Sequence, residues 1–219
     1  MIKIIYEDNH LLVVQKPINI LVQADNTNDL DLLTMLKQYL KEKYNKSGNV
    51  YLGLVHRLDR PVGGVMVFAK TSKSAARLNE QIRTHQFNKI YYAIVNGNFD
   101  GSKGTMEDKL LKNSNTNIST ISEYGKESKL EYEVISNIEG LTLVKINLLT
   151  GRSHQIRVQF SVRNTPLYGD QKYNKKAKTG EQLALFAYSV SIIHPVTKEK
   201  MTFCCELPTY YPWKLFNII

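Results

Sequence analysis

Residues 55–64 have the sequence Val-His-Arg-Leu-Asp-Arg-Pro-Val-Gly-Gly, and an apolar run follows at residues 65–69. Pro61 lacks a backbone donor and stiffens the chain, while Gly63 and Gly64 permit a tight turn or the close approach of another segment. A short run that is apolar throughout favours a buried strand. This stretch therefore predicts a charged loop that leads into a strand of the core.

On the C-terminal side, the pattern continues with a helix and a second strand. Thr71 or Ser72 is a suitable N-cap for a helix that runs through about Thr84. Ala75, Leu78 and Ile82 recur on one face at helical spacing. Residues 90–95 are apolar and aromatic, which predicts a strand.

On the N-terminal side, apolar and polar residues alternate at residues 2–6, and residues 11–14 are apolar, so two short strands are expected around an Asp8-Asn9 turn. Leucines at helical spacing predict a helix from about Leu30 to Tyr44, with a cap among residues 26–28.

The second half of the chain contains more strands than helices. Residues 98–117 are rich in Gly, Ser, Lys and Asn and predict exposed loops with weak strands, so a soft division of the chain is expected near residues 98–128. A helix is expected at about 153–162, and the lysine-rich segment 172–178 is expected to be a solvated basic loop. Further strands are expected at 129–135, 141–148, 183–193 and 201–206. Many strands and few helices predict an α+β fold with a largely antiparallel sheet.

Composition narrows the class of protein. With 219 residues, 42% of them hydrophobic, the chain can bury one sizeable core, as a single domain or as two fused halves. No run approaches the roughly 20 apolar residues of a membrane span, and the N-terminus has no pattern of a secretory signal. A cytoplasmic protein without a membrane partner is the default expectation.

The net charge and the two cysteines give further information on the class of protein. Lys and Arg total 29 against 20 Asp and Glu, a formal net charge of +9. Such an excess favours a polyanionic partner such as nucleic acid, and a basic protein with an ordinary solvated surface is the alternative. Cys204 and Cys205 are adjacent, which disfavours a disulfide between them, and two thiols alone make a poor zinc site. Reduced structural cysteines are expected.

Asp59 is the first candidate for chemistry. Arg57 and Arg60 bracket it and His56 lies nearby, and opposite charge within about 4–6 Å favours the ionised carboxylate. An ionised carboxylate on a loop can act as a nucleophile. The alternative is an ordinary surface cluster of ion pairs, because such clusters are common.

Two further segments carry side chains that could bind a substrate. In residues 149–158, Thr150 or Ser153 is expected to cap the helix, and the helix N-terminus could hold a phosphate with Arg152, His154 and Arg157; an ordinary capped helix is the alternative. In residues 89–95, the adjacent Tyr91 and Tyr92 face opposite ways. One of them can stack on a nucleobase, or both can simply fill the strand.

Five segments in this order resemble the RluA-type family of RNA pseudouridine synthases. The resemblance extends from about Tyr6 to about Pro195. The matching positions are Tyr6–Pro17, His56-Arg57-Leu58-Asp59, Lys89/Tyr91/Ala93/Val95, Thr150–Arg157 and Gly169/Asp170/Tyr173.

The resemblance implies a pseudouridine-synthase-like fold: a mixed, largely antiparallel sheet from two fused halves, flanking helices and loops, and a central active-site cleft. It implies one catalytic domain over residues 1–219, without an appended RNA-binding domain. Asp59 corresponds to the catalytic aspartate, Tyr91 to the tyrosine that packs against the target base, and Arg157 to the basic residue that pairs with the aspartate.

The resemblance also implies a substrate and the residues that contact it. Arg57 would fill the stack vacated by a flipped nucleotide, and the other polar residues of the two motifs would bind the RNA. These are His56, Arg60, Arg152, His154 and Gln155. The expected partner is ribosomal or transfer RNA with an exposed uridine; DNA, a metal and an organic cofactor are not expected, and the chain is expected to be a monomer.

One departure from the family pattern leaves an alternative open. The family commonly has Thr-Ser-Gly where this chain has Val62-Gly63-Gly64. If the two hydroxyls only shape the turn, their loss matters little. If they bond RNA or brace the aspartate loop, a non-catalytic RNA-binding protein on the same fold is the alternative. A base-releasing glycosidase is a more distant one, since such enzymes usually pair two carboxylates.

Overall fold

The computed structural model describes residues 2–25, 27, 29–97 and 101–216. Its chain contacts divide into two compact units. The first contains residues 1–88 and 187–205, and the second contains residues 89–186 and 206–219. The chain crosses between them within β5 (Asn88–Asn96), within β10 (Leu185–Ile193) and again after Cys205. The soft division expected near residues 98–128 falls inside the second unit instead.

The strands of the first unit are antiparallel where their registers are defined. β1 (Lys3–Glu7) pairs with β2 (Leu11–Lys16), which pairs with β4 (Gly63–Ala69); β3 (Gly53–Leu54) adds to β4, and β11 (Lys200–Cys204) adds to β10. β2 lies between two strands, and the side chains of residues 11–14 are fully buried. Asp8 closes the expected turn by accepting bonds from the backbone N–H groups of His10 and Leu11.

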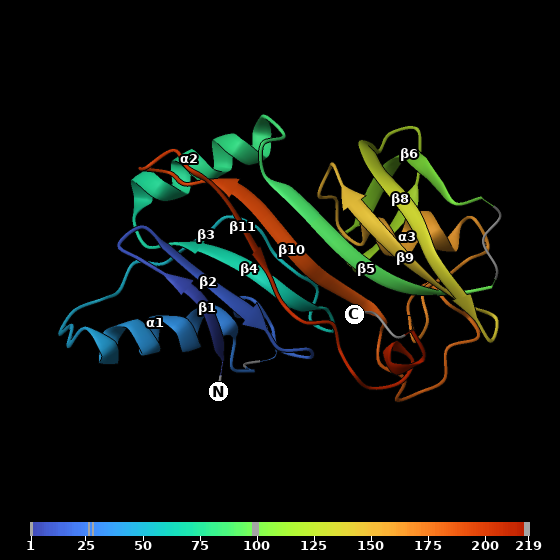
Figure 1. Ribbon diagram of the computed structural model, residues 1–219, viewed down its shortest axis with the longest axis horizontal. Helices are drawn as coiled ribbons and strands as arrows, with labels where there is room; N and C mark the ends of the chain where they lie inside the picture. Colours follow the sequence, from blue (N-terminus) through green and yellow to red (C-terminus); the bar gives the residue numbers. More distant parts are fainter. Residues whose placement is uncertain (1, 26, 28, 98–100, 217–219) are drawn as a thin grey trace. The chain divides into compact units, whose positions relative to one another are not determined.

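Two helices belong to this unit, α1 (Leu32–Lys43) and α2 (Ser72–Arg83), and its strands separate them in Figure 1. Thr71 caps α2 as expected, through a bond from the N–H of Ser74. The cap of α1 differs from the expectation: Asp31 accepts from the N–H of Thr34. Of the expected cap residues, 26 and 28 lie outside the described residues.

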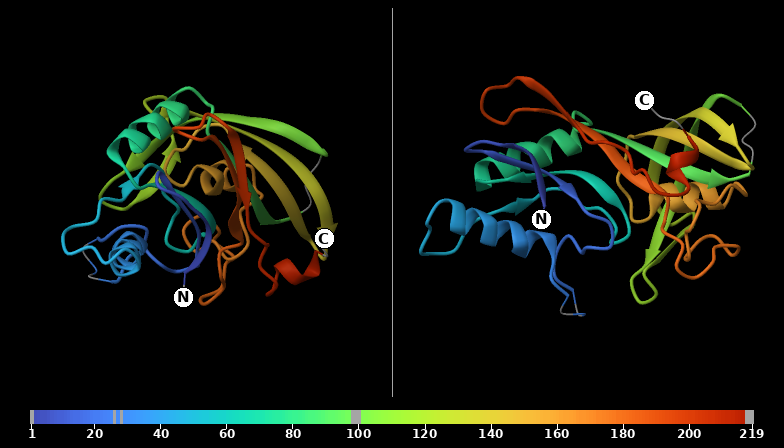
Figure 2. Two further views of the ribbon diagram at one scale, coloured as in Figure 1. Left: turned by 60° about the vertical axis from the view of Figure 1, so that its left-hand side comes forward. Right: turned by 60° about the horizontal axis from the view of Figure 1, so that its bottom comes forward.

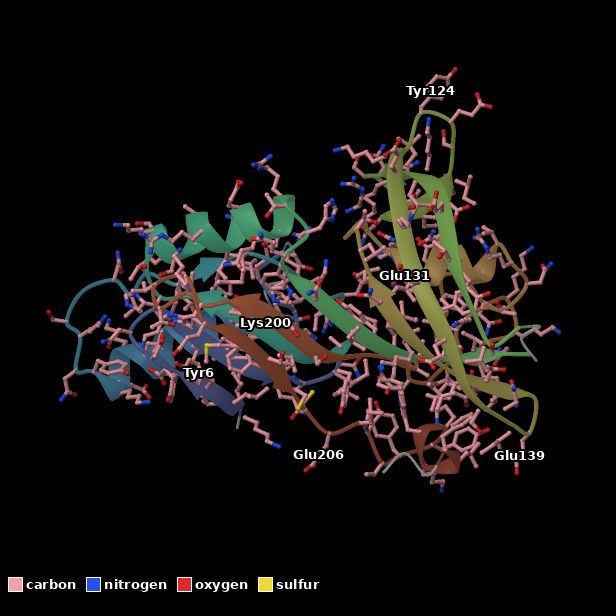
Figure 3. The ribbon with its side chains drawn as sticks, turned by 45° about the horizontal axis from the view of Figure 1, so that its top comes forward. Tyr6, Tyr124, Glu131, Glu139, Lys200 and Glu206 are labelled. Atoms are coloured by element: carbon pink, nitrogen blue, oxygen red, sulfur yellow. The ribbon has the colours of Figure 1, made fainter. Side chains whose placement is uncertain are left out.

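The second unit has the strand order β5-β9-β8-β6-β7, all antiparallel. β9 spans Leu141–Leu148 and β8 spans Lys126–Ile138. β6 (Lys103–Asn113) is an 11-residue strand, so the expectation of loops with weak strands at 98–117 is wrong for most of that range; β7 (Ile118–Ile121) ends the order. The β7–β8 turn carries Tyr124, which is 89% exposed and labelled in Figure 3.

One short helix, α3 (Gln155–Ser161), lies alongside the strands of the second unit in Figure 2. The expected cap by Thr150 or Ser153 is not formed. His154 occupies the N-cap position with a left-handed backbone and no side-chain cap. A turn of 3-10 helix, Trp213–Leu215, follows near the end of the described chain. The whole is α+β with a mostly antiparallel arrangement of strands, as predicted.

The described helices include none that is both long and apolar enough to cross a membrane. Cys204 and Cys205 are both free thiols, the first exposed and the second buried.

Candidate active site

A buried lysine fastens the loop that carries Asp59. Lys16 is fully buried at the end of β2. Its Nζ donates to the carbonyl oxygens of Pro17 (2.9 Å), Arg60 (3.0 Å) and Val62 (2.8 Å). A protonated amine has three donors, and three carbonyls match them. Burial lowers the pKa of Lys16 to about 7, while the negative charge of Asp59 raises it. Lys16 therefore holds both sides of the turn and places positive charge near Asp59.

The turn after Asp59 is held by backbone atoms. The N–H of Val62 donates to the carbonyl of Asp59 at 3.0 Å. Gly64 has a φ of +125°, and a Cβ built there would lie 2.1 Å from the carbonyl oxygen of Ala187, so only glycine fits. The bonds at position 62 use only its backbone N–H and C=O groups, which a valine provides as well as a threonine does. The departure from Thr-Ser-Gly is therefore compatible with an intact turn.

The polar neighbours of Asp59 contact other parts of the first unit. Arg60 forms an exposed ion pair with Asp29 (2.7 Å), and its Nε donates to the carbonyl of Asn19 at 3.3 Å. His56 accepts a bond through Nε2 from the backbone N–H of Val67 at 3.0 Å. Arg60 thus fastens the aspartate loop to the segment before α1, and His56 fastens it to β4.

In the second unit, Arg157 is paired with a carboxylate that sequence reasoning did not single out. The Nε of Arg157 donates to Oδ2 of Asp170 at 2.8 Å, and Nη2 donates to Oδ1 at 2.7 Å. Arg157 is 5% exposed and Asp170 1% exposed. Two parallel charge-assisted bonds fix the plane of a guanidinium. The predicted pairing of Arg157 with Asp59 stays a prediction.

Tyr173 connects Arg157 to the residue before α3. The guanidinium carbon of Arg157 lies 5.1 Å from the centre of the Tyr173 ring, within cation–π range. The hydroxyl of Tyr173 is 2.7 Å from Nδ1 of His154 and accepts the N–H of Ser119 at 2.8 Å. His154 is 8% exposed, so it lies in the interior of this network. Helix α3, strand β7 and the loop after Gly169 therefore meet at one aromatic ring.

Gln155 organises the turn that precedes α3. Its Oε1 accepts from the hydroxyl of Thr150 at 2.8 Å and from the N–H of Arg152 at 3.1 Å. Gln155 is 2% exposed, whereas Arg152 is exposed and donates through Nε to the carbonyl of Glu127. Arg57 in the first unit is also exposed. The two exposed arginines present positive charge at the surface, while Gln155 acts within the fold.

Tyr91 and Lys89 lie on the same face of β5, because residues two apart share a face of a strand. Tyr91 is 6% exposed and Tyr92 is partly exposed, so the two tyrosines differ in burial as expected. Burial lowers the pKa of the half-buried Lys89 to about 8. A Cβ built on Gly151 would lie 3.4 Å from Nζ of Lys89, which places this amine beside the turn before α3.

The structure thus groups the predicted residues in two sets. His56, Arg57, Asp59 and Arg60 share one loop of the first unit, and the others lie on β5 and around α3 in the second. The sequence did not predict that Lys16, Asp170 and Tyr173 hold other residues of the site in position. All three belong to motifs that carry the family resemblance, and those motifs could have identified them as candidates.

Comparison with known proteins decides the family. The sequence profile of the RNA pseudouridylate synthases matches residues 10–162. The chain belongs to this family. It is accordingly an isomerase that acts on RNA as a pseudouridine synthase.

Relatives of the family match along most of the chain. Ribosomal large subunit pseudouridine synthase C of Buchnera aphidicola is 33% identical over 227 residues, covering 99% of this chain and 70% of the relative. Ribosomal large subunit pseudouridine synthase D of Zymomonas mobilis is 32% identical, covering 94% and 69%. The solved structure of human RNA pseudouridylate synthase domain containing 4 superposes with a TM-score of 0.79 at 25% identity, covering 94% and 88%. The predicted fold and family are confirmed.

Proposed function

We propose that this chain isomerises a uridine of large-subunit ribosomal RNA to pseudouridine, with Asp59 as the nucleophile. The bacterial relatives are named for that RNA, and the net charge of +9 suits a polyanionic substrate. The observation that carries the assignment of Asp59 is the Lys16 clamp. A fully buried ammonium group bonded to both sides of the turn supports a fixed position for this carboxylate.

The reaction breaks the N–C glycosidic bond and forms a C–C bond at the same anomeric carbon. No redox change occurs and the uracil stays in the site, so acid–base and nucleophilic side chains suffice for each step. A uridine stacked in folded RNA must first be extruded, which costs a few kcal/mol. Binding of the RNA backbone by basic side chains offsets that cost, and affinity should fall steeply as salt rises.

The side chains have separate roles in this proposal. Asp59 attacks the sugar or the base, and Arg157 orients and balances the charge of that carboxylate. Tyr91 packs against the uracil and assists removal of the C5 proton after C5 has joined C1′. Asp170 holds the plane of Arg157 through its two bonds.

The remaining predicted residues bind RNA. Arg57 fills the vacated stack, and the exposed Arg60 and Arg152 meet phosphates. His154 and Gln155 act from inside the turn before α3, where they keep its shape. The backbone-held turn at Val62 supplies no support for the non-catalytic alternative. The monomeric state and the cytoplasmic location stay predictions.

A map of pseudouridine across the RNA of the source cells, with and without this gene, tests the proposal. We expect a site in large-subunit ribosomal RNA to disappear on deletion. Wild type should restore it, and Asp59→Ala should not. Restoration by Asp59→Ala would refute the role of Asp59, and a lost site only in transfer RNA would refute the substrate.

A further inference from the structure

The lysine-rich loop after α3 is exposed to solvent, as expected, and hydrogen bonds hold its backbone. It comprises residues 172–178 and belongs to the orange segment that follows α3 in Figures 1 and 2. Its exposed cations are Lys172, Lys175, Lys176 and Lys178. Among the described residues, none of these four ammonium groups has an ion-pair partner, so their charge is directed to solvent.

Two buried side chains fix the backbone of this loop. Oδ1 of Asp170 accepts from the N–H of Lys172 (3.0 Å) and of Tyr173 (3.2 Å). Asn174 is 5% exposed; its amide donates to the carbonyl of Leu167 at 3.1 Å and its Oδ1 accepts from the N–H of Lys176 at 3.0 Å. Such bonds hold the backbone of the loop in one conformation, so the points from which the lysine side chains extend are fixed.

The far end of the loop is closed in the same way. Gln171 donates to the carbonyl of Lys178 at 2.9 Å, and Glu181 accepts from the N–H of Lys178 at 2.8 Å. Glu181 also accepts from the hydroxyl of Tyr168. The carboxylate of Glu181 thus accepts from a backbone N–H and a hydroxyl, and it forms no ion pair with the four lysines among the described residues.

The loop begins at the carboxylate that holds Arg157. The same Asp170 binds the guanidinium of Arg157 and the backbone of Lys172 and Tyr173. Lys172 also reaches the β6–β7 turn, where its Nζ donates to the carbonyl of Asn117 at 3.2 Å. One carboxylate thus connects the guanidinium of Arg157 to the start of the lysine-rich loop.

We infer that residues 172–178 form a docking surface for the phosphate backbone of the substrate RNA. The inference rests on the proposed function, because it takes Arg157 to lie in the active site. A loop whose backbone is already ordered loses less backbone freedom when it binds a polyanion than a mobile loop does. The loop therefore adds affinity and aligns the RNA, and it takes no part in the chemistry.

The test uses two triple variants of the full chain that lose the same charge. Lys172→Gln/Lys175→Gln/Lys176→Gln changes the loop. The control, Lys41→Gln/Lys73→Gln/Lys200→Gln, changes three exposed lysines of the first unit. The probe is a fluorescent transcript of large-subunit ribosomal RNA, with its dissociation constant measured from low to high KCl. Pseudouridine formed by each protein at saturating RNA is measured in the same series.

The loop variant should bind the transcript at least tenfold more weakly, with a salt slope smaller by about 2 to 3, since each lost phosphate contact lowers the slope by about 1. Its single-turnover rate at saturating RNA should equal that of wild type, and lysine-to-arginine changes at the same positions should restore affinity. Equal loss in both triple variants, or no loss in the loop variant, would overturn the docking surface. Absence of pseudouridine from wild type would instead overturn the proposed function.

Discussion

Asp170 sets the orientation of Arg157, and its replacement tests that role. Asp170→Asn keeps the shape but removes the charge opposite a buried guanidinium, so one strong bond becomes weak and the plane is released. We predict that kcat falls at least tenfold, or about 1.4 kcal/mol, while KM for RNA changes less than threefold. Steady-state kinetics on the transcript provide the measurement.

A purely structural role of Asp170 would give a different pattern. Asp170→Glu restores the carboxylate and should recover part of kcat, whereas loss of folding would lower the amount of active enzyme in both variants alike. Tyr173→Phe is the matched control, because it keeps the ring against Arg157 and removes only the hydroxyl bonds to His154 and Ser119. A kcat of Asp170→Asn within twofold of wild type would show that Asp170 does not set the orientation of Arg157 for catalysis.

The contact between Asp170 and Arg157 could not be predicted from the sequence. The motif order identifies Arg157, and the family resemblance assigns it to Asp59. No spacing rule shows that a residue 13 positions later lies against the same guanidinium. That contact depends on Gly169, whose φ is +67° and where a Cβ would lie 2.3 Å from the carbonyl of Gln182. Long-range packing of the loop, rather than local propensity, brings Asp170 to α3.

Lys16 is the second residue whose role rests on buried geometry. Lys16→Met leaves the carbonyls of Pro17, Arg60 and Val62 without their donor, and unsatisfied buried acceptors are costly. We predict a loss of about 2 to 4 kcal/mol in the free energy of unfolding, measured by urea denaturation. The exposed control Lys41→Met should change it by less than about 0.5 kcal/mol. Equal effects of the two changes would contradict the clamp.

Among the elements, the contact of α1 with β1 depends on a carboxylate with four donors. Glu7 accepts from Tyr39, Lys43, Tyr44 and Lys70 at 2.6–2.9 Å, and its side chain is 7% exposed. Burial alone would raise the pKa of Glu7, but the bonds from Lys43, Lys70, Tyr44 and Tyr39 outweigh it and lower the pKa to about 2. The charged form is thus strongly favoured in the folded protein.

Glu7→Gln should destabilise the protein by about 2 kcal/mol at neutral pH. Because the folded pKa is depressed, the stabilisation is present above the ordinary value of 4.5 and is lost as pH falls toward 2. The difference in unfolding free energy between wild type and Glu7→Gln should therefore shrink between pH 5 and pH 2. A difference that stays constant across this range in urea denaturation would exclude the ionic contribution of Glu7.

The helix caps show which elements a local pattern can place. Thr71 was predictable because it is one of two hydroxyl residues directly before an apolar stripe. Several residues before α1 are equally good caps, and tertiary contacts choose among them: the N–H groups of Leu32 and Leu33 donate to the carbonyls of Leu21 and Val22. Those bonds fix Asp31 as the cap and Leu32 as the first residue of the helix, which the local sequence pattern does not predict.

β6 was missed for a related reason. Within its 11 residues only Met106 and Leu110 are buried, so the sequence lacks the alternation that predicts a half-buried strand. Its backbone bonds come from β8 and β7, which are distant in sequence from its start. Glycine is also disfavoured inside a strand, but at position 104 a Cβ would lie 2.6 Å from the hydroxyl of Tyr132, which leaves little space for a larger residue.

For the whole molecule, the family assignment and the lysine-rich loop come from different parts of the chain. The family profile matches residues 10–162, which include Asp59, Tyr91 and Arg157. Asp170, Tyr173 and the docking surface at 172–178 lie beyond that match. The alignment with the relative from Buchnera aphidicola covers 99% of the chain, so it extends past the profile match toward the C-terminus.

The most direct test of the central claim uses purified wild type and Asp59→Asn with a transcript of large-subunit ribosomal RNA. Pseudouridine is quantified by mass spectrometry, and RNA affinity is measured on the same preparations. We predict that wild type forms pseudouridine at one position, and that Asp59→Asn binds the transcript as tightly but forms none. Turnover by Asp59→Asn at the wild-type rate would contradict the assignment of Asp59 as the nucleophile.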